Sequence, residues 1–165
     1  MRYAFVIAVT AALLVACDRT LVFSHYEHTS TSGWERNDTL TFCAGPLTAT
    51  GDYQEEVGIR ITGQYPFTSI TLIVSQALLP AAPPAVSSQG VGVSRQDTLV
   101  CTLFDKRGAI QGDGINIYQY TFPLRSMRAE KGERLVVSMR HDMKREILPG
   151  VTDIGFTLKS SGSPR

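Results

Sequence analysis

Hydrophobic and polar residues alternate with a period of two along most of the chain. In residues 55–62, for example, Val57, Ile59 and Ile61 fall on one face of an extended backbone, while the intervening residues fall on the other. This alternation predicts strands of antiparallel sheets with one buried and one wet face. The predicted strands are residues 38–43, 55–62, 69–76, 97–104, 116–124, 133–140 and 153–159.

Short segments rich in Gly, Pro and Asp separate these strands and predict turns. Together they predict an all-β fold, an antiparallel β-sandwich of jelly-roll or immunoglobulin-like type with about seven or eight strands. At most one short helix is expected, in residues 140–148, where apolar residues recur every four positions. The residues expected to share one core are Ile59, Leu72, Leu99, Val137 and Phe156.

The first seventeen residues have the pattern of a bacterial lipoprotein signal. Arg2 precedes an apolar run that ends in Leu-Val-Ala and Cys17, and the run is shorter than the roughly 20 residues that a membrane-spanning helix needs. The pattern predicts cleavage before Cys17 and attachment of lipid to its thiol, which anchors the protein to the membrane. An ordinary signal peptide that happens to be followed by cysteine is the alternative.

This interpretation divides the chain into a single domain and its flanking segments. Residues 1–16 are the predicted signal peptide, 17–33 a lipidated tether, 34–160 the β-sandwich and 161–165 a disordered tail. The Pro- and Ala-rich residues 79–93 are expected to form a long exposed connection between two strands.

Charge and cysteine content narrow the possible partners. The 16 Lys and Arg residues become 15 once Arg2 is removed, which balances 15 Asp and Glu residues, so no basic surface favours nucleic acid. Cys43 and Cys101 remain as a pair that an oxidising compartment permits to bridge. Strand parity opposes the bridge, because Cys101 shares a face with Leu99 and Leu103 whereas Cys43 lies opposite Phe42. Both possibilities stay open.

Common catalytic motifs are missing from the sequence, which predicts a protein that is not an enzyme and uses no cofactor and no metal. His25 and His28 have the spacing of metal ligands on a helix, but solvated residues of a tether explain them more simply. Asp105, Asp113 and Asn116 offer oxygen ligands for Ca²⁺ without the spacing of a calcium loop, and a wide hairpin explains their glycine-rich surroundings.

Aromatic residues offer a second hypothesis, a carbohydrate- or ligand-binding sandwich of the cell envelope or surface. Sugar rings stack on aromatic side chains that share an exposed, concave face, and burial of the same side chains would instead indicate a structural role. The candidates are Trp34, Tyr53, Tyr65 and Tyr118.

Landmarks spread over the chain give a resemblance to a known family. The motifs are the lipobox at Cys17, Gly33-Trp34, Asn37-Asp38-Thr39-Leu40, Tyr65-Pro66-Phe67, Gly112-Asp113-Gly114 and Gly150-Val151-Thr152-Asp153-Ile154-Gly155. In this order they resemble the gliding-motility lipoprotein GldH family of Bacteroidetes, from which residues 79–93 depart. The resemblance implies a lipid-anchored protein of the cell envelope, whose partners are other envelope proteins of the motility and secretion apparatus.

The residues that follow Cys17 bear on which side of the membrane the domain lies. The residues after Cys17 lack an acidic run of the kind that resembles a surface-export tag in this phylum. A periplasmic face is therefore favoured over the cell surface.

Overall fold

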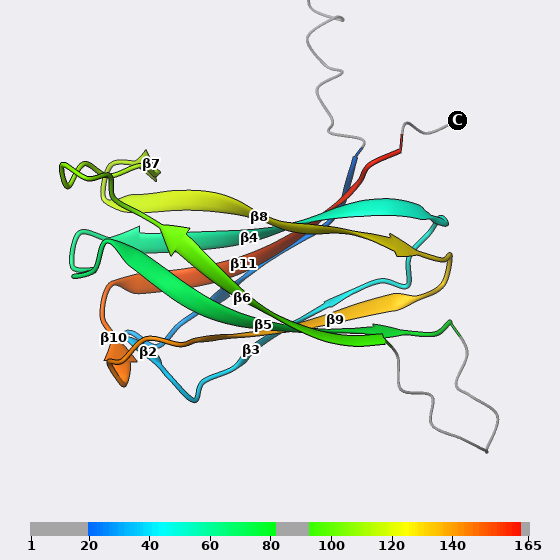
Figure 1. The fold of residues 1–165 in the computed structure, drawn as a ribbon, viewed down its shortest axis with the longest axis horizontal. Coiled ribbons are helices and arrows are strands. Elements are labelled where there is room, and N and C mark those ends of the chain that lie inside the picture. The colour runs from blue at the N-terminus through cyan, green and yellow to red at the C-terminus, as the bar shows by residue number, and fades with distance from the viewer. Residues whose placement is uncertain (1–19, 82–92, 163–165) are drawn as a thin grey trace, which may run out of the picture.

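The computed structural model describes residues 20–81 and 93–162, which form strands and no helix (Figure 1). The strands are β1 (Leu21–His28), β2 (Trp34–Glu35), β3 (Leu40–Ala44), β4 (Gly51–Thr62), β5 (Ser69–Leu79), β6 (Val93–Thr102), β7 (Asp113–Gly114), β8 (Ile117–Ala129), β9 (Arg134–His141), β10 (Ile147–Leu148) and β11 (Val151–Ser160). All seven predicted strands are confirmed, as β3, β4, β5, β6, β8, β9 and β11.

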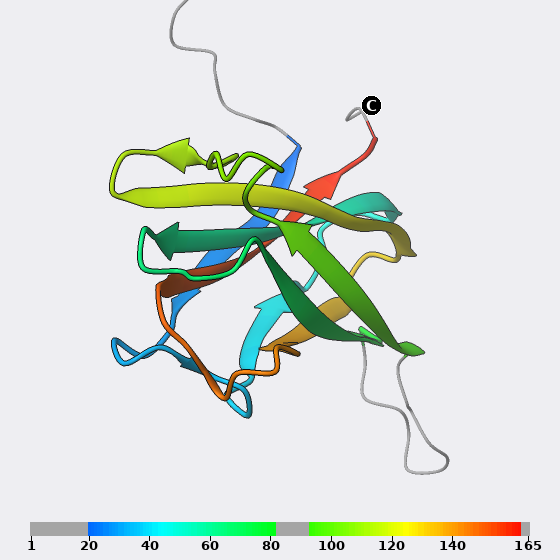
Figure 2. The ribbon, with the colours of Figure 1, turned by 60° about the vertical axis from the view of Figure 1, so that its left-hand side comes forward.

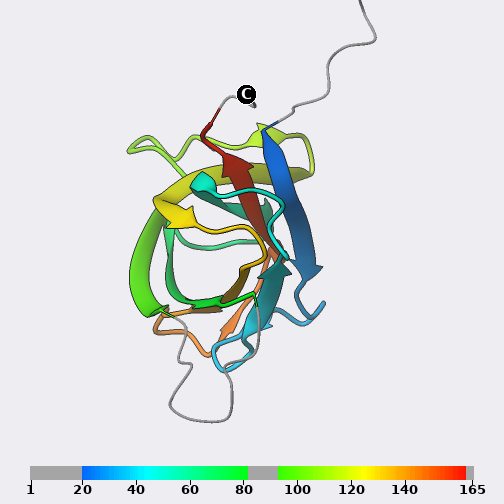
Figure 3. The same ribbon diagram turned by 90° about the vertical axis from the view of Figure 1, so that its right-hand side faces the viewer.

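Two antiparallel sheets face each other and form a sandwich (Figures 1 and 3). One sheet has the strand order β1-β11-β4-β8-β7, the other has the order β3-β9-β5-β6, and β10 pairs with β2 as a small separate ribbon. From β3 onward the chain mostly crosses from one large sheet to the other, with β5 and β6 as the exception. This arrangement of eight long strands is that of a jelly roll, so the immunoglobulin-like alternative is wrong.

The core lies between the two large sheets and contains the residues predicted from parity. Ile59, Leu72, Val137 and Phe156 are fully buried, and Leu99 is half-buried against them. Burial of apolar area of this kind is the main stabilising contribution to a fold with so many long-range strand pairings.

The predicted tether at residues 17–33 is wrong for residues 21–28, because these residues form β1. β1 pairs with β11 from Leu21 opposite Lys159 to His28 opposite Asp153, and Figure 2 shows the two strands side by side. β1 is an edge strand whose side chains are at most half-buried, so its sequence carries only a weak alternation of apolar and polar residues.

The side chain of Tyr26 packs on the outer face of the sheet that contains β1. Its ring lies over Gly155 and Gly58, which face each other in β11 and β4. A Cβ atom at Gly155 would lie 2.6 Å from a ring carbon of Tyr26, so only glycine leaves room for the ring. The guanidinium carbon of Arg60 lies 4.0 Å from the ring centroid, a cation–π contact.

The expected helix at residues 140–148 is also wrong. β9 continues to His141, and after a bend Ile147 and Leu148 form β10. The residues spaced by four do not share one face: Met139 of β9 lies in the core, Met143 in the bend packs against it, and Ile147 of β10 is exposed. The structure thus has no helix among its described residues, and none there that could cross a membrane.

Four predictions fall wholly or largely outside the described residues. The connection at residues 79–93 includes residues 82–92, and the tail includes residues 163–165. Cys17 and the predicted signal peptide lie within residues 1–19, which are likewise outside the described ranges.

Candidate functional site

Polar side chains replace apolar ones on the inner faces of both sheets toward one end of the sandwich. Glu55 stands two residues before Val57 on the buried face of β4, and Gln76 stands two residues after Val74 on that of β5. Arg95 and Asp97 continue the inward face of Leu99 along β6. Cross-strand pairing places Glu55 opposite Arg125 of β8 and Gln76 opposite Arg95.

A bulge in β8 helps to turn Arg125 inward. Glu55 pairs with Arg125 but Glu56 pairs with Pro123, so Leu124 is an extra residue in β8. A bulge of this kind re-aims the side chains beyond it, and a proline is tolerated there because it has no N–H to donate. The bulge therefore directs both Arg125 and Met127 to the space between the sheets.

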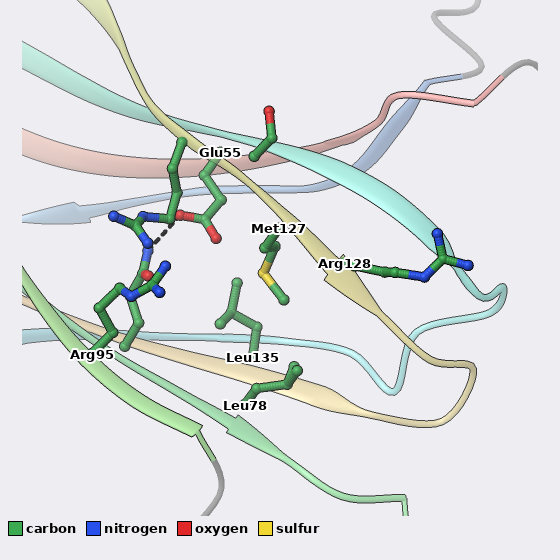
Figure 4. Close-up of a pocket in the computed structure, with 9 residues that line it drawn as sticks. Glu55, Leu78, Arg95, Met127, Arg128 and Leu135 are labelled. Atoms are coloured by element: carbon green, nitrogen blue, oxygen red, sulfur yellow. Dashed lines mark hydrogen bonds between the residues drawn. The ribbon is translucent and has the colours of Figure 1, made fainter.

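These polar residues, with the exception of Asp97, line a cavity of about 300 Å³, which we call the Glu55 cavity (Figure 4). Figure 4 shows Glu55 reaching from β4 toward the opposite layer, with Met127, Leu135 and Leu78 beside it as an apolar wall. The lining residues are Glu55, Gln76, Leu78, Arg95, Arg125, Ser126, Met127, Arg128 and Leu135.

Hydrogen bonds satisfy only part of this polar cluster. Gln76 Nε2 donates to Glu55 Oε2, and Arg125 Nη2 donates to Asp97 Oδ1 over 2.8 Å. Within the described part of the chain, Glu55 Oε1, Asp97 Oδ2 and Arg125 Nε are buried and have no hydrogen-bond partner. A buried polar group without a partner costs about 1–3 kcal/mol, so three of them in one cluster indicate a place that a bound molecule or water completes.

The carboxyl group of Glu55 is unusual in its acidity. Its side chain is 1% exposed, and this burial raises its pKa from 4.5 to about 7. The hydrogen bond from Gln76 opposes the shift, the negative charge of Asp97 adds to it, and the positive charge of Arg95 opposes it. The group consequently changes its charge near neutral pH.

The Glu55 cavity combines polar and apolar groups. Its carboxylate, amide and guanidinium groups offer hydrogen-bond donors and acceptors side by side, next to an aliphatic wall. Concave apolar sites with a few convergent polar groups are typical of ligand sites.

Strand parity is the signal that could have indicated these residues from the sequence. The prediction of a buried face in residues 55–62 used Val57, Ile59 and Ile61, and the same step of two reaches Glu55. A charged residue on a buried face is rare unless it is paired or functional. The bulge in β8 carries no comparable signal, so the position of Arg125 depended on the tertiary structure.

The aromatic residues considered for ligand binding do not form an exposed platform, so that prediction is wrong. Trp34, Tyr53 and Tyr65 are buried, and Tyr118 is half-buried against the core. Trp34 Nε1 donates to Asp38 O over 3.1 Å, and Tyr65 Oη donates to Ser69 O over 2.9 Å, which are contacts of a structural role.

Cys43 and Cys101 are free thiols, so the possible disulfide is not formed. They lie in β3 and β6, at opposite edges of a four-stranded sheet. Three strand spacings amount to about 14 Å, whereas a disulfide requires Cα atoms within about 7 Å. Cys43 is exposed, and burial raises the pKa of the Cys101 thiol to about 12.

The two metal interpretations find no support in the geometry of the described residues. His25 and His28 lie in β1, where positions three apart point to opposite faces, and they contact Glu27 and Asp153 separately. Asp105 Oδ1 accepts hydrogen bonds from backbone N–H groups of its own turn. Among residues 20–81 and 93–162, no cluster of three or more His, Cys, Asp or Glu side chains is arranged to hold a metal.

Comparison with known proteins gives a family that matches most of the chain. The family model described as GldH lipoprotein matches residues 21–158. The gliding motility lipoprotein GldH of Flavobacterium johnsoniae is 27% identical over 161 residues, which cover 93% of this chain and 94% of that protein.

Solved structures show only weak likeness. A CocE/NonD family hydrolase from Staphylococcus aureus has a TM-score of 0.38 at 10% identity, covering 86% of this chain, and this chain spans about a third (32%) of that protein. Latent PorU from Porphyromonas gingivalis has a TM-score of 0.32 at 11% identity, covering 88% of this chain and 14% of its own. These scores carry no functional argument.

Proposed function

Because this chain belongs to the GldH lipoprotein family, we propose that it is a lipid-anchored, non-catalytic binding or scaffold component of the gliding-motility and secretion apparatus of the cell envelope. The match to a gliding motility lipoprotein over 93% of this chain and 94% of that protein carries the proposal. A match of this extent covers the sandwich and its polar cavity together.

The position of β1 supports a short connection between lipid and domain. Leu21 is four residues after Cys17, so the chain between them reaches at most about 14 Å. Lipid on Cys17 would therefore hold the end of the sandwich that contains Leu21 and Lys159 close to the membrane. Leu21 and Val22 are exposed apolar residues at this end and suit such a position.

A binding role also fits the Glu55 cavity. Its polar groups can recognise a bound molecule, and its lining lacks the thiol or imidazole that common nucleophilic mechanisms use. We place the domain on the periplasmic side of the membrane, following the absence of an acidic run after Cys17.

The proposal is tested by replacing the gene in its own host with the Cys17→Ser variant, next to a deletion strain. We expect Cys17→Ser to leave the membrane fraction, to lose crosslinks to envelope proteins of the apparatus and to impair gliding or protein secretion as the deletion does. Cys43→Ser is the matched control, because its thiol is exposed on β3 and outside the lipobox. A deletion strain that glides and secretes like the parent would contradict the proposed role.

Labelling of the exposed thiol of Cys43 measures on which side of the outer membrane the domain lies. A membrane-impermeant maleimide should label Cys43 only after the outer membrane has been permeabilised, with Cys43→Ser as the blank. Labelling of intact cells would place the domain on the cell surface instead.

A further inference from the structure

The Glu55 cavity is built differently from the rest of the sandwich interior. Elsewhere the inward positions are mostly apolar, with His141 as an exception, whereas here Glu55, Gln76, Arg95 and Arg125 converge from four strands, and Asp97 bonds to Arg125. A folded core gains nothing from these groups by packing alone. Their placement around an open volume of about 300 Å³ is the arrangement of a ligand site of small size.

The free hydrogen-bonding atoms define the chemistry of the ligand. Glu55 Oε1 and Asp97 Oδ2 are acceptors without a partner among the described residues, and Arg125 Nε is a donor without one. A hydroxyl group donates to a carboxylate and accepts from a guanidinium at the same time, so neighbouring hydroxyls satisfy such a mixed set.

A cationic ligand fits this set poorly. The guanidinium groups of Arg95, Arg125 and Arg128 line the cavity against the single carboxyl group of Glu55, and they repel a cationic group. A neutral group that is purely apolar would leave all three unpartnered atoms buried without hydrogen bonds. A polyhydroxylated ligand supplies both the donors and the acceptors that these atoms need.

The aliphatic wall of the Glu55 cavity suits the apolar faces of a sugar ring. Leu78, Met127 and Leu135 provide an aliphatic surface beside the polar end (Figure 4). A pyranose ring has hydroxyl groups at its rim and C–H groups on its faces, and the latter pack against aliphatic side chains. The volume suits about one such ring.

From these contacts we propose that the Glu55 cavity binds a single sugar residue, whose neighbouring hydroxyls bridge the Glu55 carboxylate and the Arg125 guanidinium. This inference goes beyond the proposed role in motility and does not depend on it. It differs from the aromatic platform of the sequence analysis, because none of those aromatic residues lines the cavity.

Met127 offers a direct probe of binding. Methionine methyl groups labelled with ¹³C can be followed by NMR in the full-length, detergent-solubilised lipoprotein while a panel of hexoses, deoxyhexoses, N-acetylhexosamines and hexuronic acids is added. We expect at least one pyranose to shift the Met127 methyl signal in a saturable manner. The Met139 signal should stay unchanged, because that side chain is fully buried in the core away from the cavity lining.

Two variants and a control test whether the shift of the Met127 signal comes from binding in the Glu55 cavity. Glu55→Gln keeps the shape of the side chain but replaces the acceptor Oε1 by either an amide oxygen or a donor NH₂, and should weaken binding by roughly tenfold or more, as expected for a hydrogen bond to a charged group. Glu56→Gln is the matched control, because Glu56 pairs with Lys159 over 2.7 Å and does not line the cavity. Arg95→Gln, at an exposed residue, serves as a second variant should Glu55→Gln disturb the Met139 signal.

Three outcomes would overturn the proposal. One is that no pyranose shifts Met127, and another is that binding is equally strong in Glu55→Gln and Arg95→Gln. The third is that acetate or methylguanidinium shifts Met127 while no sugar does, which would show a site for a simple ion. None of these results bears on gliding or on the membrane fraction, so failure here is distinct from failure of the proposed function.

Discussion

Glu55 is a buried acid whose protonation is linked to folding. Its pKa is about 7 in the folded protein against 4.5 for the free group, mainly through burial. Between pH 4.5 and 7 the folded state keeps a proton that the unfolded state has released. The contribution of Glu55 to stability is therefore complete below pH 4.5, falls as the pH rises through this window and is constant above it.

We predict that Glu55→Gln, which has no proton to lose, gains stability relative to the wild type between pH 4.5 and pH 8. A shift of this size corresponds to about 3 kcal/mol at most, at about 1.4 kcal/mol per pKa unit. Urea unfolding of both proteins at a series of pH values measures the difference, in which the other titrating groups cancel. A difference that is the same at every pH would show that the carboxyl group has an ordinary pKa.

Gly155 is a second residue whose role comes from its surroundings. The ring of Tyr26 occupies the space where a side chain at position 155 would begin, with a ring carbon 2.6 Å from the ideal Cβ. We predict that Gly155→Ala lowers the free energy of unfolding by about 1–3 kcal/mol, the range for forcing extra volume into a packed site. Thermal or urea unfolding measures this.

The double variant Tyr26→Ala with Gly155→Ala supplies the control. Removing the ring removes the clash, so the second substitution should cost clearly less in the Tyr26→Ala background than in the wild type. Equal costs in both backgrounds would show that the contact does not constrain position 155.

At the level of elements, β1 is the segment for which the structure differs most from the prediction made from the sequence. It is an edge strand with seven residues in register with β11, and Phe23 packs against Phe156 with ring centroids 6.2 Å apart. As part of the sheet it contributes to the stability of the domain, which a tether would not.

We predict that Phe23→Ala lowers the free energy of unfolding by about 2 kcal/mol, below the 3–5 kcal/mol typical of a fully buried phenylalanine, because Phe23 is only half-buried. Val22→Ala is the neighbouring control, since Val22 is exposed and should change stability by less than about 0.5 kcal/mol. Chemical denaturation compares the two. Equal and negligible effects would restore the interpretation of this segment as a tether.

At the level of the whole molecule, the reactivity of the two thiols reports on how tightly the two sheets pack against each other. Cys43 is exposed at one sheet edge, whereas Cys101 is fully buried and its pKa is raised to about 12 by that burial. Only the thiolate reacts quickly with disulfide reagents, so burial and the raised pKa act in the same direction.

We predict that a disulfide reagent modifies Cys43 of the native protein within the mixing time of the assay. It should modify Cys101 only at the rate at which the protein unfolds. Mass spectrometry of peptides after timed labelling distinguishes the two, and addition of urea should release Cys101. The Cys43→Ser variant should then show only the slow reaction. Resistance of both thiols until a reductant is added would indicate a disulfide and contradict the structure.

The alternation of residues along the chain determined the fold class and most of its strands. In β4, Val57, Ile59 and Ile61 share the core because side chains of a strand point alternately to its two faces, which is a local property. The same parity correctly separated Cys101, on the inward face, from Cys43. The weak alternation of β1 hid an edge strand, because an edge strand buries too little on either face to require apolar residues at every second position.

The tertiary structure alone decided which sheet each strand joins and what meets across the core. Trp34, Tyr53 and Tyr65 became core residues, because aromatic side chains serve in packing or in binding and only their surroundings select between the two. The Glu55 cavity likewise depends on a bulge in β8 and on contacts between residues 21 or more positions apart, such as Gln76 with Glu55 and Arg125 with Asp97. Local sequence specifies the direction of a side chain in its strand, whereas its partners across the core are specified by how the sheets pack.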